Sequence, residues 1–339
     1  MGLFWAKKDF ELTSSGVSEV VKTRIGGIDQ YLLIQTENVK HPVLLMLHGG
    51  PGFPVPGVSN RSRDFAMVTT TKELVKQYTL VFWDQRGAGK TFSRHVSADT
   101  FNLSQFIQDA KEVINYLKSR FHQERIYLAG HSWGSILGLR LAQEIPDELY
   151  SYIGFSQIIN WAENDRLCLQ WTLERARSLG HTKAVAALEA CGEPPFVTSV
   201  KQWSTLRMWM ARYNSMIYND EQVKHPGMKL VMSILSRSPD YSIIDFANIF
   251  RGFKHSYTQA LIEEFAQIDF AVTIPRLDIP VTFIHGRKDV HVYGHIVEEF
   301  YKKLDAPQGK NFIWKDKSSH MFHLEDAEDN ERTLIRMLG

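Results

Sequence analysis

The sequence predicts an α/β protein in which a mostly parallel β-sheet is covered by helices on both faces. Apolar runs of strand length recur along the chain, and segments with the apolar periodicity of a helix separate several of them. Repeated alternation of strand and helix gives a parallel sheet, because each crossover helix returns the chain to the same end of the sheet. The 339 residues, 44% of them hydrophobic, suffice for one such domain with a large insertion.

We expect eight apolar runs to form the strands of this sheet. They cover residues 19–25, 30–36, 43–47, 80–83, 126–129, 152–155, 281–284 and 312–314. The first two runs are close together in the sequence and should form an antiparallel hairpin at one edge. Helices are predicted over 65–77 and 103–120. One face of the second helix carries the apolar residues Leu103, Phe106, Ile107, Ala110, Val113, Ile114 and Leu117.

The alternation stops between about residues 160 and 274. This stretch is rich in Trp, Met, Arg and Glu and has helical periodicity, most clearly in WAENDRLCLQWTLERARSLG and SIIDFANIFRGFKH. The strand pattern then resumes with IPVTFIHGRKD. We therefore expect a core in two parts, 1–159 and 275–339, with 160–274 inserted as a helical lid. A lid is favoured over an independent helical domain because ligands of such sheets bind outside the carboxyl ends of the strands.

Composition argues against several classes of protein. The chain has 39 Lys and Arg against 38 Asp and Glu, so no binding of nucleic acid or anionic membrane is predicted. Its apolar runs are too short to span a bilayer, and MGLFWAKKDF lacks the features of a secretory leader. Cys168 and Cys191 have neither metal-ligand nor redox spacing, and His291 and His295 suggest a solvated helix face rather than a zinc site. We expect a cytoplasmic protein without metal or cofactor. The sequence does not indicate an oligomeric state.

The segment DQRGAGKTF, residues 84–92, resembles the end of a phosphate-binding loop, because it contains Gly89-Lys90-Thr91. A true phosphate-binding loop has another glycine five positions before Gly89, so that backbone amides surround the phosphates. Here that position is Asp84, whose carboxylate would repel a phosphate. The segment is therefore not predicted to bind a nucleotide.

The strongest chemical signal is Gly130-His-Ser132-Trp-Gly134, which matches G-x-S-x-G between a predicted strand and an amphipathic helix. In this setting the serine occupies a strained turn, and small residues on either side let the chain reverse. The helix that follows directs its first amides at charge forming near the serine. The loop in LLMLHGGPG, residues 44–52, also exposes amides, so we expect Gly50 and Trp133 to form an oxyanion hole.

A serine nucleophile needs a base to accept its proton and an acid to orient that base. In chains with this motif the acid and then the histidine follow the serine. Asp289 follows the run 281–284, and His320 lies after the last strand behind two small serines. Asp316, adjacent to the histidine, and His323, closer to the C-terminal helix, are the weaker alternatives.

Together these motifs resemble those of the proline iminopeptidase family of α/β-hydrolases. The shared segments are HGGPG at 48–52, DQRGAG at 84–89 and GHSWGS at 130–135, and the likeness covers nearly the whole chain, most weakly in the lid. The resemblance implies the α/β-hydrolase fold and a serine hydrolase that releases N-terminal residues, proline first, from small peptides. It also implies that Asp84 and Arg86 brace the loops around the site.

The departures from the family concern the amine of the substrate, since a buried ammonium needs a paired charge. Val290 follows Asp289 where some members have Glu, and LRMWMARYNS offers Arg212 where others have Glu. The remaining acidic candidates, each by default a solvated charge, are Glu163, Asp165, Glu174, Asp240 and Asp245. A carboxylesterase or amidase for small acyl substrates is the alternative. A non-catalytic receptor is disfavoured because no triad residue is missing.

Overall fold

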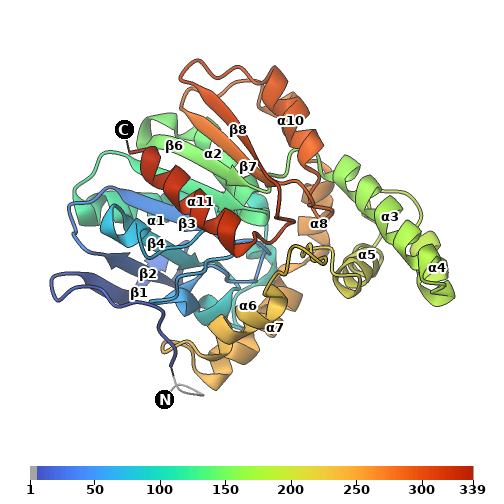
Figure 1. Cartoon of the computed structure of the whole chain (residues 1–339), viewed down its shortest axis with the longest axis horizontal. Coiled ribbons are helices and arrows are strands. Elements are labelled where there is room, and N and C mark those ends of the chain that lie inside the picture. Colours follow the sequence, from blue (N-terminus) through green and yellow to red (C-terminus); the bar gives the residue numbers. More distant parts are fainter. Residues whose placement is uncertain (1–5, 339) are drawn as a thin grey trace.

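The computed structural model describes residues 6–338, so the first five residues of the segment in which we expect no leader lie outside it. Its centre is one sheet of eight strands in the order β1-β2-β4-β3-β5-β6-β7-β8 (Figure 1). The strands are β1 (Val17–Ile25), β2 (Ile28–Thr36), β3 (Val43–Leu47), β4 (Thr79–Asp84), β5 (Ile126–His131), β6 (Leu149–Phe155), β7 (Val281–Gly286) and β8 (Lys310–Lys315).

All eight predicted strands are present, and the sheet is mostly parallel as predicted. β1 and β2 form the antiparallel hairpin at one edge, and β2 pairs antiparallel with β4. The other neighbouring pairs, from β4–β3 to β7–β8, are parallel. The carboxyl ends of β3 to β8 therefore lie at one end of the sheet.

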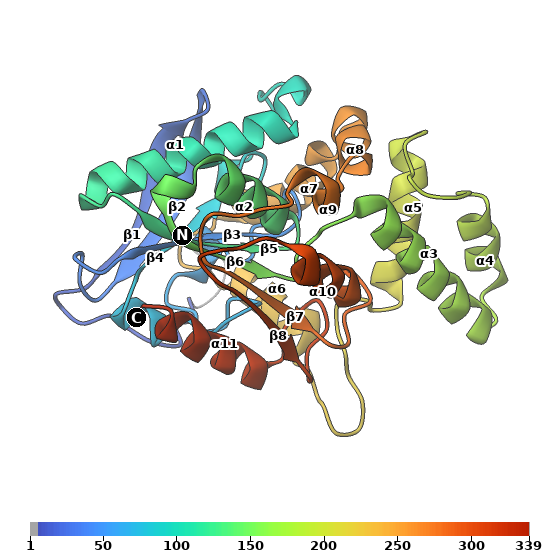
Figure 2. The same ribbon diagram turned by 90° about the horizontal axis from the view of Figure 1, so that it is seen from above.

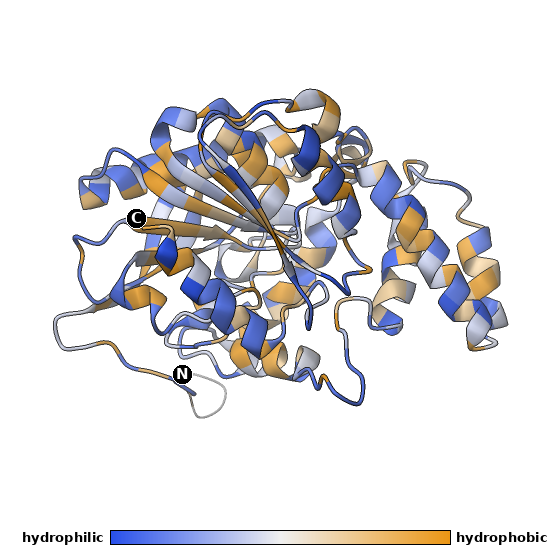
Figure 3. Cartoon of the chain, turned by 45° about the horizontal axis from the view of Figure 1, so that its top comes forward, coloured by the Kyte–Doolittle hydropathy of each residue, from blue (hydrophilic) through white to orange (hydrophobic). Residues whose placement is uncertain are grey.

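Helices cover both faces of this sheet, and the chain has the α/β-hydrolase fold. α1 (Leu103–Phe121), α2 (Trp133–Glu144) and α10 (Gly294–Lys303) pack on one face, and α11 (Leu324–Arg336) packs on the other (Figure 2). Alternate residues of a strand serve the two faces: Leu45 belongs to the first core and Leu44 to the second. The central strands are accordingly mostly hydrophobic, whereas the outer helices are hydrophobic on one side only (Figure 3).

The prediction of a helix over 65–77 is wrong, because only a 3-10 turn, Leu74–Lys76, forms there. The backbone carbonyls of Met67 and Val68 instead accept hydrogen bonds from the amide of Phe322 and the side chain of Asn330, at 3.1 and 2.7 Å. The hydroxyls of Thr69 and Thr71 bond to backbone carbonyls and compete with helix formation. Apolar periodicity alone could not distinguish a helix from this buried irregular segment.

Between β6 and β7 the regular elements of the described chain are all helical. They are α3 (Trp161–Ser178), α4 (Thr182–Glu189), α5 (Val200–Arg212), α6 (Gly227–Ser236), α7 (Ile243–Ser256), α8 (Gln259–Ala266) and α9 (Phe270–Thr273). We call residues 160–274, the segment expected to be a lid, the helical insert. α3, α4 and α5 extend to one side of the sheet and share a small core of their own (Figure 1). None of the helices in residues 6–338 is long and apolar enough to cross a membrane.

The two ends of the helical insert are joined to each other by backbone hydrogen bonds. The Trp161 amide donates to the Ile268 carbonyl at 3.0 Å, and the Phe270 amide donates to the Ile159 carbonyl at 2.8 Å. The side chain of Asn160 also donates to Asp269 at 2.9 Å. The insert therefore leaves the core and returns to it at the same place.

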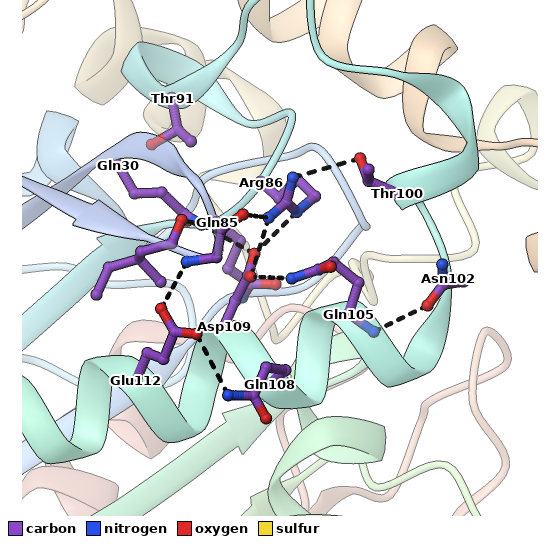
Figure 4. Close-up of polar contacts among 12 residues, drawn as sticks. Gln30, Gln85, Arg86, Thr91, Thr100, Asn102, Gln105, Gln108, Asp109 and Glu112 are labelled. Atoms are coloured by element: carbon purple, nitrogen blue, oxygen red, sulfur yellow. Dashed lines mark hydrogen bonds and ion pairs between the residues drawn. The ribbon is translucent and has the colours of Figure 1, made fainter.

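Arg86 of the DQRG segment forms a fully buried ion pair with Asp109 of α1, and their side chains are 1% and 0% exposed (Figure 4). The guanidinium donates to both carboxylate oxygens, at 2.9 and 3.0 Å, and to the Gly26 carbonyl at 2.7 Å. Asp109 also accepts from the amides of Gln30 and Gln105, at 2.8 and 2.7 Å. This network ties the loop after β4 to the β1–β2 turn and to α1.

Arg86→Met should strongly destabilise the fold, because it leaves the Asp109 carboxylate buried without a cation. We expect the free energy of unfolding at pH 7 to fall by about 3–5 kcal/mol, measured by urea unfolding. Arg287→Met is the matched control, since Arg287 pairs with Asp316 at side-chain exposures of 50% and 78%. It should cost under about 1 kcal/mol. Equal losses in the two variants would contradict this account of the DQRG segment.

Candidate active site

Ser132 lies in a sharp turn between β5 and α2. Its backbone has φ 54° and ψ −119°, a conformation that residues with side chains rarely adopt. Two glycines make the turn possible. A Cβ on Gly130 would lie 2.4 Å from the Gly134 carbonyl oxygen, and one on Gly134 would lie 2.3 Å from that of Leu47. The G-x-S-x-G segment thus forms a strained strand-to-helix turn with the serine at its tip.

His320 and Asp289, which come from the loops after β8 and β7, form a buried hydrogen-bonded pair. His320 Nδ1 lies 3.0 Å from Asp289 Oδ2, and Asp289 Oδ1 accepts from the amides of His291 and Val292 at 2.8 and 2.9 Å. Burial raises the pKa of Asp289, but the neighbouring His320 and His285 outweigh this effect and hold the pKa well below its usual value. The carboxylate therefore stays ionised and can orient the imidazole.

The alternatives considered for the acid and the base lie elsewhere. Asp316 is 78% exposed at its side chain and pairs with Arg287. His323 caps the N-terminus of α11. Ser132 and His320, by contrast, line the same cavity. In the part of the chain that the structure describes, their side chains are not hydrogen-bonded to each other, and such bonds often tighten only when substrate is bound.

Two further imidazoles, from His131 and His291, flank His320, and the sequence analysis missed both. Their ring centroids lie 4.8 and 4.5 Å from that of His320. Burial lowers the pKa of His131 to about 3, and burial together with His320 lowers the pKa of His291 well below its usual value. Both rings are therefore neutral neighbours. For His131 the available signal was its place inside G-x-S-x-G.

The expectation that His291 lies on a solvated helix face is wrong. α10 begins only at Gly294, because the Asp289 carboxylate holds the amides of His291 and Val292 in a loop. His291 lines the cavity, and its Nδ1 lies 3.0 Å from Ser215 Oγ. His295 is on α10 and exposed. Closeness to Asp289 in the sequence was the signal that could have separated the two.

The loop after β3 is fixed by His48, which is buried. Its Nδ1 lies 2.6 Å from the Gly49 carbonyl oxygen, and its Nε2 lies 3.2 Å from the amide of Gln85. Because a backbone amide can only donate, Nε2 accepts and Nδ1 carries the proton. Burial lowers the pKa of His48 to about 4, so the ring is neutral at pH 7. Gln85 also donates to the His48 carbonyl and accepts from the Trp133 indole, at 3.2 and 2.9 Å.

These bonds orient the amides expected to form the oxyanion hole. The Gly49 carbonyl and the Gly50 amide belong to one planar peptide unit, so holding the carbonyl fixes the direction of the amide. The loop after β3 lies beside the Ser132 turn, since a Cβ on Gly49 would lie 3.4 Å from Ser132 Cβ. Within residues 6–338, neither the Gly50 amide nor the Trp133 amide donates to another group. Both donors are free for an oxyanion near Ser132.

Ser132 and His320 open into a cavity of about 370 Å³. The helical insert supplies much of its wall, including the aromatic residues Trp161, Trp203, Phe250, Phe253 and Tyr257. Among the described residues that line the cavity, Arg207 is the only lysine or arginine, and none is Asp or Glu. The cavity is thus mostly apolar, and Ser132 and His320 are part of its lining.

None of the five candidate carboxylates for a substrate amine lines this cavity. Asp165 is buried behind the wall and pairs with Arg207, whose guanidinium lies 4.9 and 5.4 Å from the ring centroids of Trp203 and Trp161. The other four bond to side chains outside the cavity. The pairs are Glu163–Arg166, Glu174–Gln170, Asp240–Arg61 and Asp245–Lys90.

Comparison with known proteins shows the family of the chain. Residues 55–237 match the family model described as serine aminopeptidase, S33. The "probable aminopeptidase YbaC" of Bacillus subtilis (strain 168) is 30% identical over 312 residues, which cover 92% of this chain and 93% of that protein. The "proline iminopeptidase" of Heyndrickxia coagulans is 25% identical over 307 residues, 86% and 89% of the two chains.

A solved structure shares the fold. The proline iminopeptidase of Mycobacterium smegmatis superposes with a TM-score of 0.59 at 18% identity, covering 94% of this chain and 97% of that one. The family model matches more than half of the chain, and the Bacillus relative covers nearly all of it. The chain belongs to the serine aminopeptidase S33 family.

The buried neutral histidines should make the protein less stable as the pH falls below about 6.5, the pKa of an unfolded imidazole. His48 and His131 have pKa values of about 4 and about 3 in the folded chain. Between these values and 6.5 the unfolded chain binds more protons. Each histidine should therefore lower the free energy of unfolding by roughly 1.4 kcal/mol per pH unit.

Urea unfolding at pH 7 and pH 5 measures this effect as a difference between variants. Burial raises the pKa of Asp84 to about 6, which acts in the opposite direction, so the slope of the wild type alone does not isolate the histidines. His131→Gln should weaken the destabilisation between the two pH values, whereas His95→Gln, at an exposed position, should not. The same pH dependence in His131→Gln and the wild type would contradict the prediction.

Proposed function

We propose that this protein is a serine hydrolase that works through an acyl-enzyme. In the proposed mechanism, Ser132 attacks the carbonyl carbon of the substrate, and His320 accepts the hydroxyl proton. Asp289 holds the imidazole and stabilises its charged form, while the amides of Gly50 and Trp133 stabilise the oxyanion. One observation carries the proposal: the strained Ser132 turn and the His320–Asp289 pair meet at one cavity.

In the first half of the reaction, His320 passes its proton to the leaving amine or alcohol, and the acyl group stays on Ser132 Oγ as an ester. In the second half, water attacks this ester and His320 accepts a proton from the water. The tetrahedral intermediate then collapses, the acid leaves, and Ser132 recovers its proton. His131 and His291 exchange no proton in this scheme, because their lowered pKa values keep both rings neutral.

For the substrate, we propose short peptides with a free N-terminal residue, proline first. The names of the Bacillus and Heyndrickxia relatives support a peptidase. The wall that the helical insert builds around the cavity supports small substrates, since only a short chain fits beneath such a cover. In this proposal the insert acts as the lid of the site.

A carboxylesterase or amidase for small acyl substrates is the second candidate. It is favoured by the cavity wall, where no described residue is Asp or Glu. An ammonium group removed from water needs a paired negative charge, and its transfer is costly without one. A neutral acyl group entering the same cavity needs no such partner.

Substitutions at the proposed triad should reduce activity, and loss of the nucleophile should abolish covalent labelling by a fluorophosphonate probe. Ser132→Ala should remove the label entirely, and Asp289→Asn should lower kcat by roughly 10³- to 10⁴-fold, because the imidazole loses its orientation. His323→Gln and Asp316→Asn are matched controls at the alternative positions, and both should keep near-normal labelling. Labelling that persists in Ser132→Ala, or that disappears in His323→Gln, would refute the assignment.

The two substrate classes should be separated by blocking the amine. If a group in the cavity binds the ammonium, kcat/KM for N-blocked Pro-arylamide should be lower than for free Pro-arylamide by about tenfold to a hundredfold, the value of a charge-assisted contact. Butyrate esters, which carry no amine, serve as the reference for hydrolysis without an ammonium contact. Equal rates for free and blocked arylamides, with much faster turnover of the esters, would reject the peptidase and favour the esterase.

A further inference from the structure

The loop after β3, residues 48–52, is held from a second side by a tyrosine of the helical insert. The hydroxyl of Tyr257, which lies between α7 and α8, donates to the Gly50 carbonyl at 2.8 Å. His48 holds the peptide unit before Gly50, as described above, and belongs to the core. Tyr257 holds the peptide unit after Gly50 and belongs to the insert. The two peptide units that meet at Gly50 are therefore fixed by different parts of the chain.

The contacts on either side of Gly50 restrict a residue whose backbone conformation requires glycine. Its φ is 120°, in a region that favours glycine, and a Cβ there would lie 2.9 Å from the backbone nitrogens of Gly52 and Phe53. A glycine has no side chain to restrict its two backbone torsions. Hydrogen bonds to the carbonyls on either side of it therefore decide where its amide points.

The same part of the insert is packed tightly against the core loops. A Cβ on Gly52 would lie 2.9 Å from Phe253 Cα, and a Cβ on Gly252 would lie 2.0 Å from the Gly87 carbonyl oxygen. The backbone of α7 thus contacts both the HGGPG and the DQRG loops. The Tyr257 ring is also fixed, with its centroid 4.3 Å from that of Trp203 and 4.9 Å from that of Phe253.

We propose that Tyr257 is a positioning residue for the oxyanion hole. Its hydroxyl holds Gly50 in the orientation that presents the Gly50 amide to the oxyanion, so the hole is complete only when the insert is seated on the core. The inference rests on the proposed function, because it needs Ser132 to form a tetrahedral intermediate. It adds that the insert contributes to the chemical step as well as to the cavity wall.

The test is Tyr257→Phe, which removes the hydroxyl and keeps the ring that lines the cavity. With p-nitrophenyl butyrate as the probe, we expect kcat to fall about fivefold, the worth of one hydrogen bond, while KM stays within about twofold. The rate of inactivation by a fluorophosphonate should fall by a similar factor, since its phosphoryl oxygen occupies the oxyanion hole. A merely structural role would not produce this parallel loss.

Tyr78→Phe is the matched control. The Tyr78 hydroxyl donates to the Leu334 carbonyl at 2.7 Å, so it also makes a tyrosine-to-carbonyl bond, and Tyr78 precedes β4 at the opposite end of the strand from the site. Melting temperatures set a working temperature at which both variants are folded. Tyr257→Phe with the kcat and inactivation rate of the wild type, or an equal loss in Tyr78→Phe, would overturn the proposal. Both results leave the proposed function standing, whereas persistent labelling of Ser132→Ala would remove it.

Discussion

Parallel pairing of β3 to β8 is the constraint on which the site depends. Because these strands run in one direction, the loops that follow β3, β4, β5, β7 and β8 gather at one end of the sheet. The loops carry, in that order, His48, Gln85, Ser132, Asp289 and His320. Residues up to 272 positions apart in sequence thereby share one small volume.

The polar groups in this volume are arranged so that few formal charges are buried. His48, His131 and His291 are kept neutral, and each has a defined partner or neighbour. The ionised carboxylate of Asp289 is compensated by two amides and by His320. A site with neutral imidazoles at His48, His131 and His291 and with free amide donors is suited to a reaction in which negative charge develops on one oxygen.

The sequence predicted the parts of this arrangement that depend on local pattern. Strands appear as apolar runs, and Ser132, Asp289 and His320 follow one another in order at strand ends. In the structure Ser132 and His320 line one cavity, and Asp289 bonds to His320. The features that could not be predicted depend on distant partners. Residues 65–77 are irregular because they bond to the region around α11, and Asp165 is unavailable to a substrate because Arg207 lies 42 positions away in sequence but beside it in space. The apolar periodicity of a sequence does not indicate contacts between such distant residues.

The joined ends of the helical insert have a consequence for how such a protein can change. The bonds between Trp161 and Ile268 and between Phe270 and Ile159 join the first and last residues of the insert. The core therefore contacts the same short junction, whatever the length of the helices between its two ends. Helices can be lengthened, lost or exchanged there without altering the register of a single strand. The sheet and the helical insert can therefore vary separately in sequence and length. Variation beyond this junction is then compatible with an unchanged sheet, provided that the contact from Tyr257 to the Gly50 carbonyl is kept.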